Sequence, residues 1–271
     1  MNKNSPYPPQ AHLNNAFIKS AEARPLRIMA EYIEPQQRFD DHDIRDTIVF
    51  FGSARTLSRA AALAELKQAK ASGGNLEAAE MQLVMSRYYE DARELARRLT
   101  EWSKALEGTD RRFVICTGGG PGIMEAANRG AREAKGLSIG LCIDLPFESG
   151  GNPYITPELA FEFHYFFMRK FWFTYLAKTM VAMPGGFGTL DELFEVLTLI
   201  QTKKMTKHQP IVLFGGDYWN SVVDFDALVS AGTIGAKDLD LIHRTDSVDD
   251  AFDFITRELT EYALAAPGGS L

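Results

Sequence analysis

The sequence predicts an α/β protein of the Rossmann-like type, with a doubly wound, mostly parallel sheet and helices on both of its faces. Three observations support this prediction. Short apolar runs typical of buried strands alternate along the chain with longer segments of helical periodicity. This alternation favours parallel strands joined by crossover helices. Two glycine-rich turns directly follow apolar runs, as happens where parallel strands end at a ligand crevice.

The N-terminal part of the chain divides into a tail and a helix. Residues 1–22 are largely polar and begin with a proline-rich stretch, so we expect a flexible tail without a secretory signal. Residues 23–32 carry apolar side chains at helical spacing, with Pro25 near their start, and predict a helix that packs on the body. Pro35 is expected to end that helix. Because no linker or repeat interrupts residues 23–271, we expect them to form a single domain with this helix as an extension.

The remaining elements follow from apolar runs and from the patterns between them. Helices are expected at residues 58–71, 76–106 and 123–131, and in the aromatic segment that carries Arg169. Charged residues interrupt that aromatic segment well short of the ~20 apolar residues of a membrane span. Strands are expected at residues 47–53, 112–117, 138–143, 159–165, 179–183, 210–214 and 240–243.

Composition narrows the class of function. The chain has 271 residues, of which 45% are hydrophobic, enough to bury a large core. Its 29 basic and 36 acidic residues give a net charge of -7, which argues against binding to nucleic acid or to a membrane surface. Cys116 and Cys142 each lie in an apolar run, so we expect buried thiols rather than a disulfide or a metal pair, and a reducing cytoplasm as the location.

Residues 184–192 read Pro-Gly-Gly-Phe-Gly-Thr-Leu-Asp-Glu and suggest a site for an anion beside a carboxylate. Glycines allow backbone N–H groups to approach a ligand closely, and the start of the following helix favours a phosphate. Residues 117–122, Thr-Gly-Gly-Gly-Pro-Gly, repeat this arrangement. Two such turns on one sheet predict a phosphorylated small molecule at the carboxyl ends of the strands.

Other interpretations of these residues remain open at this stage. Gly118, Gly120 and Asp144 suggest a dinucleotide fingerprint, but its third glycine position holds Ile123. Neither glycine run continues into the Gly-Lys-Ser/Thr of a nucleoside triphosphatase. The first turn could also be a tight turn without a ligand, and the acids at 191 and 192 could simply favour the helix dipole. His164 lacks a second ligand at helical spacing, so no metal site is expected.

Four motifs in order resemble the LOG family of nucleoside 5′-monophosphate phosphoribohydrolases, named for cytokinin-activating enzymes. They are Phe-Gly-Ser-Ala-Arg at residues 51–55, Thr-Gly-Gly-Gly-Pro-Gly-Ile-Met-Glu at 117–125, Met-Arg-Lys at 168–170, and the 184–192 segment. The resemblance covers roughly residues 46 to 215. Plant-type members have Met-His-Glu before the arginine, whereas this chain has Phe-Phe-Met, so a general purine or pyrimidine monophosphate is the expected substrate class.

The resemblance implies a hydrolase that splits a nucleoside 5′-monophosphate, AMP-like or cytokinin-type, into free base and ribose 5-phosphate without a cofactor. It also implies a homodimer or a higher homo-oligomer, with the site near the subunit contact. An oxocarbenium-like transition state requires an acid near the ribose. The functional arginine and glutamate carry over onto Arg169 and Glu192. Asp144, Glu148 and Glu125 are weaker candidates for sugar or base contacts. Substrate or phosphate binding is expected at Gly52, Ser53, Gly119, Gly120, Gly122, Lys170, Gly185, Gly186, Gly188 and Thr189.

Two other functions are compatible with the motifs. A non-catalytic carrier of a nucleotide or of a molybdopterin-type cofactor would need only the glycine turns. The older label of the family, lysine decarboxylase-like, would require a lysine that holds pyridoxal phosphate. Lys170 and Lys178 are available for that role, but the glycine turns select neither of them.

Overall fold

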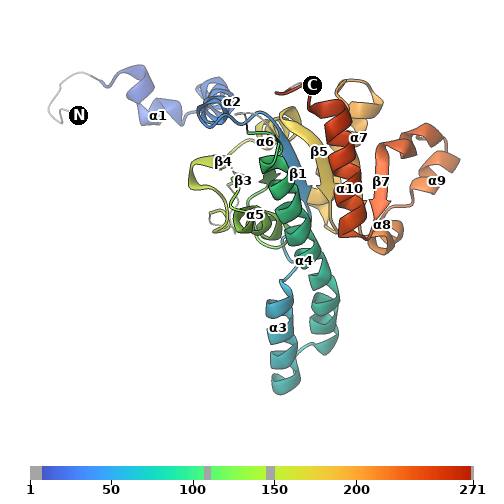
Figure 1. Ribbon diagram of the computed structural model, residues 1–271. Coiled ribbons are helices and arrows are strands. Elements are labelled where there is room, and N and C mark those ends of the chain that lie inside the picture. Colours follow the sequence, from blue (N-terminus) through green and yellow to red (C-terminus); the bar gives the residue numbers. More distant parts are fainter. Residues whose placement is uncertain (1–7, 107–110, 145–149, 270–271) are drawn as a thin grey trace.

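The computed structural model describes residues 8–106, 111–144 and 150–269 (Figure 1). Seven strands form one parallel sheet in the order β4-β3-β2-β1-β5-β6-β7. This confirms the doubly wound, parallel fold predicted from the sequence. The strands are β1 Thr47–Phe51, β2 Val114–Thr117, β3 Ser138–Ile143, β4 Ala160–Phe163, β5 Ala177–Ala182, β6 Ile211–Phe214 and β7 Ile242–Thr245.

The winding direction reverses at β1, in the middle of the sheet. The chain first builds β2, β3 and β4 on one side of β1 and then returns to build β5, β6 and β7 on the other. Val49 of β1 lies between Cys116 of β2 and Met180 of β5. The carboxyl ends of β2, β1 and β5 are therefore neighbours, and this reversal point is where ligands bind in open α/β sheets.

Two apolar layers cover the sheet, because side chains alternate between its faces. Ile48 and Phe50 pack with α4 Leu76–Lys104, α5 Ile123–Glu133 and α10 Val248–Glu258. Val49 and Phe51 pack on the opposite face, which is covered by α2 Arg24–Asp41, α6 Phe166–Tyr175 and α7 Phe187–Gln201. The other helices are α1 Asn15–Ile18, α3 Arg59–Ser72, α8 Gly216–Val222 and α9 Phe225–Ser230, with short helical turns at Ala11–Leu13, Pro157–Leu159, Ala236–Leu241 and Leu259–Ala263.

The prediction that Pro35 ends the N-terminal helix is wrong, because α2 continues through it to Asp41. A proline inside a helix leaves the carbonyl four residues earlier without its N–H partner. Here that carbonyl belongs to Glu31, and the indole Nε1 of Trp172 donates to it at 3.0 Å. Beyond the proline, Phe39 packs on Phe161 and Trp172 with ring centroids 4.8 and 5.3 Å apart. These tertiary contacts keep the second half of the helix in place.

Other boundaries differ less from the prediction. The last strand begins at Ile242 rather than at residue 240, because residues 236–241 form a 3-10 helix. In the tail, the described residues contain two short helical turns, and Arg27 donates to the carbonyls of Ile18 and Ser20, both at 2.6 Å. The flexible tail of residues 1–22 and the single domain of residues 23–271 remain predictions.

Two peripheral parts of the fold stand out in Figure 1. The helices α3 and the first half of α4 project from the body as a hairpin, and the N-terminal segment with α1 reaches away from the sheet. Among residues 8–106, 111–144 and 150–269, no helix combines the length and the apolar character that crossing a membrane requires.

A buried charge cluster lies at the amino ends of the strands, just before β1. Asp46 is fully buried and pairs with Arg112 and, at 3.5 Å, with the Lys178 ammonium. Burial raises the pKa of Asp46 despite these two cations. The backbone N–H of Gly268 also donates to Asp46 at 3.1 Å, and Lys178 donates to the carbonyl of Ala266 at 2.9 Å. The cluster thus fastens the C-terminal segment across the base of the sheet.

Candidate active site

Three loops meet at the carboxyl ends of β2, β1 and β5. The backbone N–H of Ser53, after β1, donates to the carbonyl of Pro184, after β5, at 2.9 Å. The carbonyl of Ser53 in turn accepts from Ile123 at 3.1 Å, at the start of α5. The loop after β1 therefore joins the two glycine turns, and the structure brings together the three loops that the sequence singled out.

Glycine is required where these loops touch. Gly122 has a φ of 69°, and a Cβ at this position would collide with the carbonyl oxygen of Ser53. Gly119 has a φ of 76°, and its Cβ would collide with the Sγ of Cys142. A side chain at either position would push the loops apart.

The turn after β5 leaves the start of α7 open. Gly186 is the N-cap of α7, and as a glycine it offers no side chain to cap the first backbone N–H groups of this helix. Gly186 and Gly188 are exposed and have open space where a Cβ would lie. Gly185 and Thr189 are buried and touch each other. Uncapped N–H groups at a helix start favour an anion, so this end of α7 can accept a phosphate.

Glu192 lies one helical turn after Gly188 on the same face of α7. Only 7% of its surface is exposed. Burial raises its pKa to about 7, although the charges of Arg169 and Lys170 lower it, while Glu195 and Asp191 raise it further. The carboxyl therefore changes its charge near neutral pH, which suits a group that exchanges protons during catalysis.

Arg169 comes from α6 and reaches the same region. Its Nε donates to the carbonyl of Leu141 on β3 at 2.7 Å, and its guanidinium lies 5.0 Å from the ring centroid of Phe173. The guanidinium also lies against Gly118, since a Cβ on that glycine would collide with it. Of the positive charges that act on Glu192, that of Arg169 has the largest effect. Arg169 and Glu192, the two residues expected to be catalytic, are therefore near enough for their charges to interact.

A hollow of about 400 Å³ opens between the turn after β2, the end of β3, α6 and the start of α7, and Glu192 is not among the described residues that line it. Its walls include the glycine turn at 118–120, Met124, Phe166, Arg169 and Gly188. Cys142 also lines this hollow and is only partly buried, whereas Cys116 is buried as expected. The expectation that both thiols are buried is therefore wrong for Cys142, because its strand ends at the hollow. The volume and the mixture of backbone, apolar and cationic walls suit a small anionic ligand.

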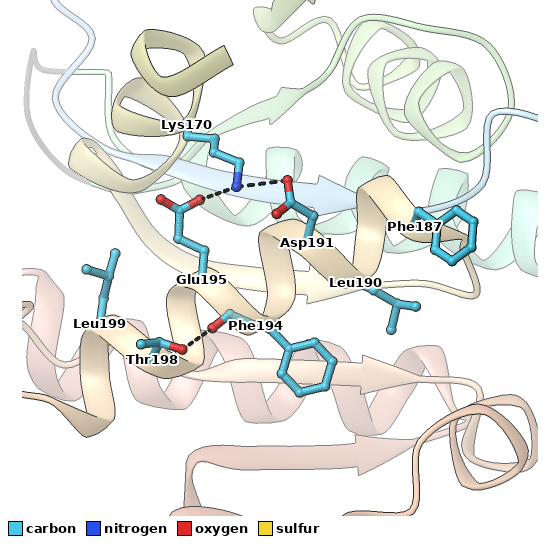
Figure 2. A pocket seen from close by; sticks show the side chains of 8 residues that line it. All are labelled: Lys170, Phe187, Leu190, Asp191, Phe194, Glu195, Thr198 and Leu199. Atoms are coloured by element: carbon cyan, nitrogen blue, oxygen red, sulfur yellow. Dashed lines mark hydrogen bonds and ion pairs between the residues drawn. The ribbon is translucent and has the colours of Figure 1, made fainter.

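The side chain of Lys170 pairs with two acidic side chains of α7. Its ammonium lies 2.8 Å from a carboxylate oxygen of Asp191 and 3.0 Å from one of Glu195, as Figure 2 shows. These three side chains line an outer groove on α7 together with Phe187 and Phe194 (Figure 2). Lys170 thus tethers α6 to α7, and its expected contact with phosphate remains a prediction.

The weaker candidates for substrate or cofactor contacts lie in separate parts of the chain. Asp144 is exposed, and the carboxylate of Glu125 accepts from the hydroxyl of Tyr89 at 2.7 Å. Glu148 lies outside the described residues. Lys178 belongs to the charge cluster at the amino ends of the strands, so the fold separates it from both glycine turns. In the described ranges, no group of three or more His, Cys, Asp or Glu residues could hold a metal ion.

Two supporting residues were missed by the sequence analysis. The side-chain amide of Asn152 donates to the carbonyls of Gly119 and Gly120, both at 3.1 Å. The hydroxyl of Tyr218 donates to the carbonyl of Gly185 at 2.6 Å. Each holds one glycine turn from a segment well separated in sequence. A polar residue in a Pro/Gly/Asn loop was the only signal for Asn152, and nothing in the sequence pattern indicated Tyr218.

The results of comparison with known proteins agree with the motifs found in the sequence. A sequence model of a family described as "Possible lysine decarboxylase" matches residues 124–255. The cytokinin riboside 5′-monophosphate phosphoribohydrolase LOG7 of Arabidopsis thaliana is 30% identical over 172 residues, which are 56% of this chain and 75% of that protein. The enzyme LOG3 of the same plant, with the same activity in its name, is 28% identical over 154 residues, which are 55% of this chain and 67% of that protein.

A solved structure resembles the fold. The X-ray structure of the structural-genomics target TM1055 has a TM-score of 0.50 and 22% sequence identity to this chain, covering 78% of this chain and 99% of that one. At this identity the likeness shows a shared fold alone.

Proposed function

Because this chain belongs to the LOG family of phosphoribohydrolases, we propose that it hydrolyses the N-glycosidic bond of a nucleoside 5′-monophosphate. The products are the free base and ribose 5-phosphate. The observation that supports this most strongly is the buried Glu192, with a pKa of about 7, next to Arg169 and one turn after an open helix start. A protein that only carried a nucleotide would need the glycine turns, but not a proton-exchanging acid beside them.

The 5′-phosphate binds at the start of α7 in this proposal. The N-cap Gly186 offers no side chain to the N–H groups that follow it, and the exposed Gly186 and Gly188 leave room for phosphate oxygens. The turns after β1 and β2 complete the cradle through Ser53 and Gly122, which touch each other. Anchoring the phosphate places the ribose over the next turn of α7, where Glu192 lies.

Glu192 acts on the attacking water. When the bond between C1′ and the base nitrogen breaks, its electron pair leaves with the base, and positive charge builds up on the ribose ring. The ionised carboxylate of Glu192 stabilises this charge and accepts a proton from the water whose oxygen bonds to C1′. The leaving base takes up a proton from solvent at the nitrogen that was bonded to C1′, and Glu192 then returns the proton of the attacking water to solvent, so that one water is divided between sugar and base. A pKa near the working pH suits this role, because the carboxylate must first be ionised and then be able to hold a proton.

Arg169 supports the ionised form of Glu192. Its guanidinium stays charged at any working pH and lowers the pKa of the buried carboxyl. From its place beside Gly118 on the wall of the hollow, it can also pair with an anionic substrate.

We also propose that the protein acts as a homodimer through the face formed by α6 and α7. Phe166 and Phe167 of α6 are exposed, and Phe187 at the start of α7 is 92% exposed. Phe166 and Gly188 line the hollow, so a second copy on this face would lie at its rim. Burial of large aromatic side chains is the dominant stabilising contribution in such interfaces.

The reaction is tested with the purified chain and a panel of nucleoside 5′-monophosphates, with free base resolved by chromatography. We expect base release from at least one nucleotide and none from the matching nucleoside, which lacks the phosphate. Glu192→Gln keeps the size of the side chain but removes its charge, and should lower kcat by about 100-fold or more. Nucleotide binding should persist in this variant, since the phosphate cradle does not include Glu192.

Asp253→Asn is the control. It removes an exposed carboxylate from α10, on the other face of the sheet, and it should retain most of the wild-type rate. Tight nucleotide binding by the wild type without base release from any substrate would contradict the proposal and support a carrier instead.

A further inference from the structure

Glu31 of α2 contacts the start of helix α6. The carboxylate of Glu31 accepts from the backbone N–H of His164 at 2.9 Å and from that of Tyr165 at 3.2 Å. Tyr165 is the N-cap of α6, and its own side chain does not cap the helix. A carboxylate at this end of a helix satisfies unpaired N–H groups and interacts favourably with the helix dipole.

The same residue also holds the second half of α6. Its backbone carbonyl accepts from the indole Nε1 of Trp172 at 3.0 Å. This carbonyl is available because Pro35, four residues later, has no N–H to donate to it. Side chain and backbone of Glu31 therefore fix α6 at residues 164–165 and again at residue 172. Arg169 lies between these two anchor points.

Helix α2 is itself held firmly against the edge of the sheet. Arg38 donates to the carbonyls of Glu158 and Ala160 at 3.0 and 2.9 Å, and its guanidinium lies 3.9 Å from the ring centroid of Phe161. The buried Phe39 packs on the same ring. The anchor for α6 thus rests on β4, rather than on a loosely attached helix.

We propose that Glu31 is a positioning residue for the hydrolase site, holding α6 so that Arg169 meets Glu192. The inference rests on the proposed function for its kinetic effects. The phosphate cradle belongs to β1, β2, β5 and α7 and does not depend on Glu31. Loss of the clamp should therefore affect the chemical step more than binding of the nucleotide.

The test compares Glu31→Ala, Glu31→Gln and the control Asp41→Ala, which changes an exposed carboxylate at the far end of the same helix. In Glu31→Ala we expect kcat to fall by about 10- to 100-fold while KM changes little, since small displacements of a catalytic group have effects of this size. Glu31→Gln keeps one carboxamide oxygen that can still accept from His164, and should recover part of the rate. Asp41→Ala should match the wild type.

The pH profile provides a readout that a general loss of folded protein would not change. The charges of two residues of α6, Arg169 and Lys170, lower the pKa of Glu192, and those of two acids of its own helix, Glu195 and Asp191, raise it. If α6 shifts away, the pKa of Glu192 rises, because both cations move with it. The acidic limb of the profile in Glu31→Ala should therefore shift to higher pH, and that in Asp41→Ala should stay in place.

The outcomes separate this inference from the proposed function. A folded Glu31→Ala with the wild-type kcat and the wild-type acidic limb would overturn the positioning role while leaving the hydrolase intact. If Glu31→Ala does not fold, the comparison moves to Glu31→Gln, which keeps the size of the side chain and the backbone carbonyl that accepts from Trp172. If the wild type releases no base, the proposed function fails, and hydrogen exchange decides the inference. Faster exchange at residues 164–170 in Glu31→Gln than in Asp41→Ala supports the clamp, and equal exchange overturns it.

Discussion

At the scale of single residues, the ionised form of Glu192 destabilises the folded chain. Burial raises its pKa from 4.5 to about 7, so between these two values the folded state holds a proton that the unfolded state has released. The stabilising effect of this proton is fully present below pH 4.5 and is lost as the pH rises through about 7. Above neutral pH, the buried carboxylate of the proposed site therefore lowers the free energy of unfolding, as is common for catalytic acids.

Glu192→Gln should consequently be more stable than the wild type above neutral pH. The neutral amide has no charge to desolvate, so the free energy of unfolding at pH 8 should rise by up to about 3 kcal/mol, the equivalent of the pKa shift. At pH 5 the wild-type carboxyl is already protonated, and the two proteins should be nearly equally stable. Urea denaturation at both pH values measures the difference. An equal gain at both pH values would show that packing, not ionisation, is responsible.

The sequence motif indicated Glu192 and Arg169 as site residues, but it did not indicate how burial and neighbouring charges change the pKa of Glu192. The pKa of Glu192 depends on burial and on the charges of α6, both of which follow from tertiary packing. Lys170 illustrates the same limit, because its neighbour Arg169 faces the hollow while its own ammonium pairs with Asp191 and Glu195. Adjacent residues on a helix point in different directions, and the motif alone does not say which one faces the ligand.

At the scale of elements, the junction of the glycine turns should tolerate no side chain. Gly122→Ala adds a Cβ at a φ of 69° and also drives it into the carbonyl oxygen of Ser53. Gly73 is the control for a positive φ, because it has a φ of 70° with open space around the position of a Cβ, although its ψ of 26° differs from the −130° of Gly122. Gly73→Ala should cost about 1 kcal/mol of stability through backbone strain, and Gly122→Ala several times as much.

Thermal unfolding of the two glycine variants measures the difference, and nucleotide binding should fall only in Gly122→Ala. Equal destabilisation in both variants would mean that the loops can separate freely, and that the contact between Ser53 and Gly122 does not define the cradle.

The order and type of the elements could be predicted because the chain alternates clear strand and helix patterns. Residues 47–51 and 138–143, for example, are apolar runs with turns at their ends, and both are strands. The path of α2 through Pro35 was not predictable from local sequence. What keeps that helix intact is the indole of Trp172, whose hydrogen bond to Glu31 joins segments 141 residues apart.

At the scale of the whole molecule, the exposed aromatic face of α6 and α7 leads to a prediction about assembly. Light scattering after gel filtration should give the mass of a dimer for the wild type, and Phe167→Asp should shift it towards the monomer, because a charge would have to be buried in the contact. Leu63→Asp on the projecting hairpin is the control, since it changes an equally exposed apolar residue on another surface. A wild-type monomer, or a dimer unaffected by Phe167→Asp, would contradict this face as the interface.

The charge cluster at Asp46 has a consequence for the order in which the protein can mature on the ribosome. Asp46 precedes the first strand to be synthesised, yet one of its hydrogen-bond donors is the N–H of Gly268, and its partner Lys178 also donates to the carbonyl of Ala266. An emerging chain that has completed all seven strands still lacks these donors and acceptors. These last hydrogen bonds at the base of the sheet can therefore form only after translation has passed Gly268.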